Sequence, residues 1–192
     1  MTRIGITLLL FVGIFVGYCQ SFPTKPKALS VDCRSKGNND EFKRRLKLRK
    51  NAEDQTTIWL FKGEELSIHF HLPQPAMIDI LDVRYSNDGG VDRIGLSLDD
   101  VELGTFKTVV QYGWGMQWNH FESSGHVGNE TFLDSGNHKL TITVLDSDPY
   151  GVEIDYIRFN VHGSRVDHLD RDHFMCIHNP PDKNGKPAHP FQ

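Results

Sequence analysis

Apolar and polar residues alternate along most of this chain with the two-residue period of a β-strand. The clearest stretch is ELSIHFHL (65–72), in which four apolar residues alternate with polar ones. Because successive strand side chains point to opposite faces of a sheet, this stretch predicts a strand with one buried face. Pro73 ends it, since proline cannot donate a ladder hydrogen bond.

Similar short stretches recur, separated by residues that favour turns. None shows the 3.6-residue period of an amphipathic helix over ten or more residues. The pattern therefore predicts an all-β fold, a single antiparallel β-sandwich of about eight or nine strands. The predicted strands cover 28–33, 56–61, 65–72, 77–86, 93–98, 101–110, 118–123, 138–145 and 152–161.

The two ends of the chain depart from this pattern. Residues 1–19 hold Arg3 and then an apolar run that is short for a bilayer span, as in a secretory signal peptide cleaved after Cys19. We therefore expect a secreted, extracellular protein without a membrane span. We interpret residues 20–27 as a loose lead-in, 28–161 as the sandwich, and the His-, Asp- and Pro-rich residues 162–192 as an extension lying on it.

The net charge is mildly acidic, −4 for the full chain, which gives no indication of a nucleic-acid partner. One segment is strongly basic, KRRLKLRK at 43–50. Such a run is typical of a solvated strand face, and the alternative is a contact with sulfated polysaccharide.

Two covalent features follow if the chain is secreted. Removal of the signal leaves Cys33 and Cys176, an even pair in an oxidising compartment, so we predict a disulfide between them. The one glycosylation sequon begins at Asn129 and lies between predicted strands, where modifying enzymes could reach it.

Four blocks of sequence give a more specific indication. They are KGEELSIHFHLPQPAMIDILDVRYSND, IGLSLDDVELGTF, YGWGMQW, and LDSGNHKLTITV followed by YGVEIDYIRF. In this order they resemble the motifs of carbohydrate-binding modules of families 6 and 35, and the last block is the most diagnostic. The resemblance covers about residues 28–161 and implies a galactose-binding-like jelly roll that is secreted, non-catalytic and lectin-like, with glycans or glycoproteins as partners.

The resemblance also implies a site. Two loop aromatics would sandwich a sugar ring, and these positions fall on Trp59 and Trp114, the latter set between two glycines that let its loop turn outward. The family's hydroxyl-binding Asn falls on Glu153. We expect Trp118, beside Met116, to belong to the core.

A structural calcium ion is the one cofactor that the resemblance leaves open. The carboxylates nearest to the family's calcium ligands are Asp32 and Asp155, but a hard cation needs six or more oxygens. The first strand offers only one acid here, and the disulfide could replace the ion in tying that strand to the chain's end.

Other chemistry is less well supported. The tail holds several metal-ligand types without a known metal spacing, namely His168, Asp170, Asp172, His173 and His178. Four carboxylates close together could suggest a glycoside hydrolase, namely Asp146, Asp148, Glu153 and Asp155. The remaining alternative is a structural protein of a skeletal, cuticular or other extracellular matrix that keeps the fold without a sugar site.

Overall fold

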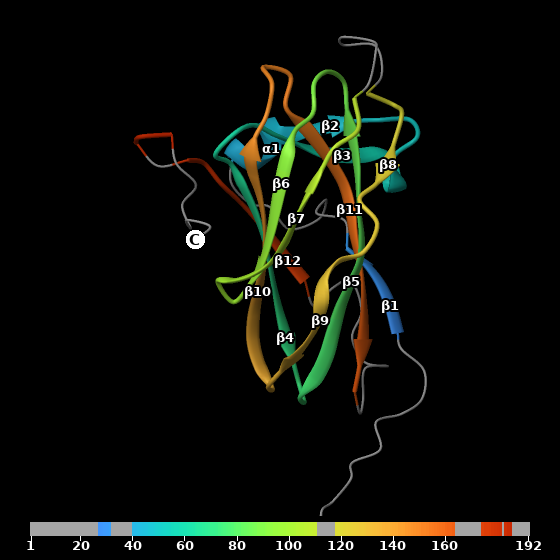
Figure 1. Cartoon of the computed structure of the whole chain (residues 1–192), viewed down its shortest axis with the longest axis vertical. Helices are drawn as coiled ribbons and strands as arrows, with labels where there is room; N and C mark the ends of the chain where they lie inside the picture. Colours follow the sequence, from blue (N-terminus) through green and yellow to red (C-terminus); the bar gives the residue numbers. More distant parts are fainter. Residues whose placement is uncertain (1–26, 32–39, 111–117, 164–173, 182, 186–192) are drawn as a thin grey trace, which may run out of the picture.

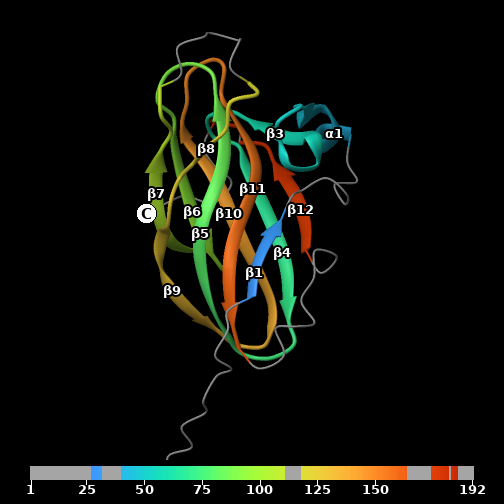
Figure 2. The ribbon, with the colours of Figure 1, turned by 90° about the vertical axis from the view of Figure 1, so that its right-hand side faces the viewer.

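The computed structural model describes residues 27–31, 40–110, 118–163, 174–181 and 183–185. In these ranges the chain forms two antiparallel sheets that pack face to face, as Figures 1 and 2 show. The predicted all-β sandwich is therefore confirmed. No helix in the described part of the chain is long and apolar enough to cross a bilayer.

The first sheet has seven strands. Its main order is β2 (Leu46–Leu48), β3 (Thr56–Leu60), β11 (Val152–His162), β5 (Ala76–Asn87) and β8 (Glu122–Ser123). Two further strands attach to this path, β1 (Lys27–Val31) on β11 and β9 (Val127–Leu133) on β5.

The second sheet has five strands in the order β12 (Phe174–Asn179), β4 (Glu65–Leu72), β10 (Gly136–Asp146), β6 (Arg93–Leu98) and β7 (Val101–Lys107). The predicted extension after residue 162 thus contributes the edge strand β12 to the sandwich. A short helix, α1 (Asp40–Arg45), and a 3-10 turn at Glu53–Gln55 flank β2. No helix was predicted here, because one turn and a half leaves no readable period.

The core lies between the sheets and follows the alternation seen in the sequence. The predicted inward residues of β4, together with Ile142 of β10 and Ile157 of β11, are each at most 5% exposed. Figure 1 shows α1, β2, β3 and β8 gathered at one end, where the β5–β6 and β10–β11 connections also turn. We call this the loop end, and it carries the candidate site.

Candidate functional site

Trp59 stands on the outward face of β3 at the loop end. The neighbouring Ile58 and Leu60 point into the core, so strand alternation places the indole outside, where it is half-buried. Its Nε1–H donates a 2.7 Å hydrogen bond to the carbonyl oxygen of Tyr150 in the β10–β11 connection. The ring of Phe61 tilts against it with centroids 4.5 Å apart.

Trp118 packs against Trp59 in an edge-to-face arrangement, with centroids 6.2 Å apart. It is half-buried at the surface, so the expectation that it belongs to the core is wrong. The tryptophans contact each other because the segment before β8 returns to the sheet beside β3, a long-range arrangement that local hydrophobicity does not reveal. Trp114, the second predicted stacking residue, lies outside the described residues.

Both tryptophans carry a cation on the ring. The Lys47 ammonium lies 4.5 Å from the Trp59 centroid, and the Arg49 guanidinium carbon lies 5.5 Å from the Trp118 centroid. Such contacts hold a cation over the electron-rich face of an indole. The loop end is therefore an aromatic surface whose described rings are partly covered by basic side chains.

Glu153, the predicted hydroxyl-binding residue, lies opposite Trp59 in the strand register, where other side chains cover it. It is fully buried, and Arg49 holds both of its carboxylate oxygens, with Nε donating to Oε2 at 2.7 Å. Thr57 donates a further hydrogen bond to Oε2 at 2.7 Å. A buried carboxylate needs such partners because burying an unpaired charge is costly. The carboxylate is thus engaged by Arg49 and Thr57 on both of its oxygens.

Asp155, the predicted calcium ligand, is held in a similar way. Its carboxylate accepts hydrogen bonds from the Arg84 guanidinium and, at 3.0 Å, from the backbone amide of Glu53. Burial raises the pKa of Asp155 to about 6, although both of these donors lower it. Within the described ranges no three metal-ligand side chains come together, and Asp32 lies outside those ranges. Arg84 thus supplies a positive charge beside Asp155.

Arg84 also extends the aromatic surface. Its guanidinium carbon lies 4.6 Å from the ring centroid of Phe121 and 5.8 Å from that of Tyr156. A third pair, Arg158 with Asp82, continues along the same two strands, β11 and β5. Sequence reasoning missed these pairs because each joins residues more than seventy positions apart.

The carboxylates of the β10–β11 connection organise loops. Asp148 accepts hydrogen bonds from the amides of Gly90 at 2.6 Å and Tyr150 at 2.8 Å, which ties two connections together. Asp146 pairs with Lys62 at 2.7 Å, and that hydrogen bond lowers the pKa of Asp146. The four acids considered for hydrolysis therefore have protein partners, an arrangement that favours structural roles over acid–base chemistry.

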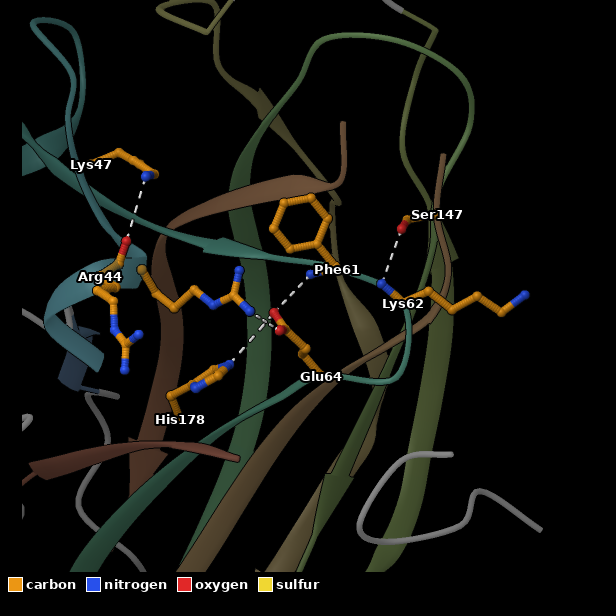
Figure 3. Close-up of polar contacts among 8 residues, drawn as sticks. Arg44, Lys47, Phe61, Lys62, Glu64, Ser147 and His178 are labelled. Atoms are coloured by element: carbon orange, nitrogen blue, oxygen red, sulfur yellow. Dashed lines mark hydrogen bonds and ion pairs between the residues drawn. The ribbon is translucent and has the colours of Figure 1, made fainter. Parts of the chain in front are cut away.

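Glu64, shown with its partners in Figure 3, anchors the basic segment 43–50. The Glu64 carboxylate pairs with Arg45 at the end of α1 and accepts the backbone amide of Phe61 at 3.0 Å. The imidazole of His178 on β12 approaches it at 3.5 Å. This buried acid thus links the end of α1 to the segment after β3 and to β12, and so holds the basic segment at the loop end.

The remaining predicted sites lie elsewhere. Asn129 is exposed, but it stands on β9 rather than between strands. Cys176 is buried on β12, and Cys33 lies outside the described residues, so the disulfide stays a prediction. Of the metal-ligand types in the tail, only His178 lies in the described part of the chain, and its side chain is completely buried.

No protein-family model and no curated protein matches this chain. Solved carbohydrate-binding modules do. A family 35 module from Clostridium thermocellum is 16% identical over 59% of this chain and 85% of the module, with a TM-score of 0.42. A family 35 module from Cellvibrio japonicus is 15% identical over 69% of this chain and 92% of the module, with a TM-score of 0.46.

Larger enzymes also match. A Paenibacillus cycloisomaltooligosaccharide glucanotransferase is 14% identical over 58% of this chain, with a TM-score of 0.43, and the chain spans only 16% of that enzyme. The two modules belong to family 35, one of the two families that the sequence motifs resemble, and they match with identities of 15–16% and TM-scores of 0.42–0.46.

Proposed function

We propose that this protein is a secreted, non-catalytic module that binds glycans at the loop end, over Trp59, Trp118 and Tyr150. The observation that carries the proposal is the pair of half-exposed indoles in edge-to-face contact. A pyranose ring presents C–H groups on its face and hydroxyls on its rim. An aromatic surface edged by polar groups can satisfy both.

The surroundings of the two indoles supply the polar edge. The Tyr150 side chain is 38% exposed, and Lys47 lies over Trp59 with a long, mobile stem that can swing aside to let a sugar reach the ring. The predicted contact from Trp114 remains part of the proposal. Glu153 supports the site by orienting Arg49, whose guanidinium lies over the ring of Trp118.

The test is a glycan array with the purified secreted protein, followed by calorimetry on the glycans that bind. We expect weak single-site binding, on the order of 10–1000 μM, because few contacts offset the cost of ordering the partners. Trp118→Ala, Trp59→Ala and Trp114→Ala should each weaken binding at least tenfold.

Phe132→Ala is the matched control. Phe132 is 52% exposed on β9, away from the loop end, so its loss should leave glycan binding unchanged. Equal affinity in the wild type and all three tryptophan variants would move the site elsewhere. Failure of the wild type to bind across a broad panel would favour the structural-matrix role, to which the burial of Glu153 also points.

A further inference from the structure

We infer that the ligand of the loop end is an anionic polysaccharide carrying sulfate esters, held by Lys47, Lys50 and the outward edges of Arg49 and Arg84. This inference rests on the proposed function and specifies its ligand class. It rests on the arrangement of charges on the outer face of the seven-stranded sheet, where basic groups lie at the surface and their acidic partners are buried beneath them.

Three ion pairs on this face share one arrangement. In each, the carboxylate is buried and the guanidinium reaches toward solvent. The side-chain exposures are 22% for Arg49 over 0% for Glu153, 29% for Arg84 over 0% for Asp155, and 45% for Arg158 over 7% for Asp82. The negative charges thus lie inside the protein, and the positive groups form the surface that a ligand meets.

The guanidiniums are also held in place. Arg49 makes a two-point contact with Glu153, and Arg84 donates to Asp155 and, at 3.3 Å, to the backbone carbonyl of Asn51. The Arg49 guanidinium also lies over the ring of Trp118, and the Arg84 guanidinium over the ring of Phe121. A planar guanidinium fixed in this way keeps further N–H groups for an oxyanion and loses little conformational entropy on binding.

Lysines add charge that the acids below do not offset. The segment 43–50 contains six basic residues and no acidic one, in a chain whose net charge is −4. Arg45 and Arg49 are paired with Glu64 and Glu153. Lys50 is exposed, and the ammonium of Lys47 lies over the Trp59 ring, where it can meet an anionic group and leave the ring to the sugar.

This distribution favours sulfate esters on a polymer over one carboxylate. Several cations lie along one surface, so a matching ligand carries several anionic groups along a chain. A sulfate ester stays ionised at any physiological pH and offers three oxygens to Lys and Arg donors. The buried acids do not repel such a ligand, because their charges are already paired.

The test uses calorimetric titration of the full secreted protein with sulfated dextran, unmodified dextran and polygalacturonate. Sulfated dextran should bind most tightly, and its affinity should fall severalfold between about 0.05 and 0.3 M NaCl, because salt screens exposed charges. The double variant Lys47→Gln/Lys50→Gln should weaken this binding at least fivefold without changing the melting temperature by more than a few degrees.

Lys107→Gln/Lys183→Gln is the matched control. It removes the same charge from exposed positions at the end of β7 and after β12, two strands of the five-stranded sheet, so both lysines lie off the outer face of the seven-stranded sheet, and the variant should bind sulfated dextran as the wild type does. Equal losses in the two double variants would overturn the inference, because the attraction would then depend only on net charge. Equal or tighter binding of polygalacturonate would also overturn it. Binding of a neutral glycan that needs Trp118, without binding of sulfated dextran, would overturn this inference and leave the proposed function standing.

Discussion

At the scale of single residues, Asp92 shows how the fold changes the chemistry of an ordinary side chain. It is completely buried at the loop end, where Asp148 donates its backbone amide to Oδ1 at 3.1 Å. Burial raises its pKa from 3.8 to about 7, and the nearby Asp148 and Asp146 add to the rise. The folded protein therefore binds a proton here that the unfolded chain releases near pH 4.

Stability should consequently fall as pH rises from about 4 to about 7, and the penalty should be complete above pH 7. At pH 8, Asp92→Asn should raise the free energy of unfolding by about 2–4 kcal/mol, since each pKa unit corresponds to about 1.4 kcal/mol. At pH 4 it should have little effect. Urea denaturation at both pH values measures this, with the exposed Asp134→Asn as control. A variant no more stable than the wild type at pH 8 would contradict the burial argument.

The candidate site was only partly predictable at this scale. Trp59 was predicted from the resemblance to carbohydrate-binding modules, and Trp114 from that resemblance together with the glycines on either side of it. The environment of Glu153 was not, because its partner Arg49 stands 104 positions away. Alternation correctly places Glu153 and Asp155 off the core face, yet it cannot show that arginines from other elements cover that face.

At the scale of elements, alternation located most of the strands because period two is strong wherever one face is apolar. It missed β9, whose VGNETFL sequence is largely polar, and β12, whose FMCIHN sequence lies in a tail rich in charges. Both are held by pairing with distant strands, β5 and β4, rather than by their own patterns. For this reason the composition of residues 162–192 predicted an extension lying on the sandwich and did not reveal strand β12.

Strand β12 supports a prediction about that tail. Phe174 is 4% exposed and contacts Phe70 and Phe159 at centroid distances of 5.6 and 5.4 Å, so it bridges the two sheets. Phe174→Ala should lower the free energy of unfolding by about 3–5 kcal/mol, as expected for a large cavity in a core. Met175→Ala, on the outward face of the same strand, should cost less than about 1 kcal/mol.

Chemical denaturation of both variants measures the difference. Similar small losses in the two would mean that β12 does not pack into the core in solution. The tail would then be the separate extension that the composition indicated.

At the scale of the whole molecule, the predicted disulfide would close most of the chain into one loop. Cys176 already lies in the core on β12, in register with Ile68 of β4. A bond to Cys33 would connect this edge strand to the segment that follows β1, close to the opposite end of the sequence. A cross-link across such a long loop lowers the conformational entropy of the unfolded chain. In the chain-entropy account the bond should therefore stabilise the fold by about 4–5 kcal/mol.

Mass spectrometry of the unreduced protein, expressed through an oxidising secretory pathway, should show no free thiol. Reduction should lower the melting temperature by roughly 10 °C or more, because a few kcal/mol shift the midpoint of a domain of this size by that much. Cys33→Ser should reproduce the loss and leave Cys176 reactive only after unfolding, since its side chain is buried. Two alkylated cysteines in the unreduced, denatured protein would show that the bond is absent. The pairing of β12 with β4 would then be what holds the end of the chain on the sandwich.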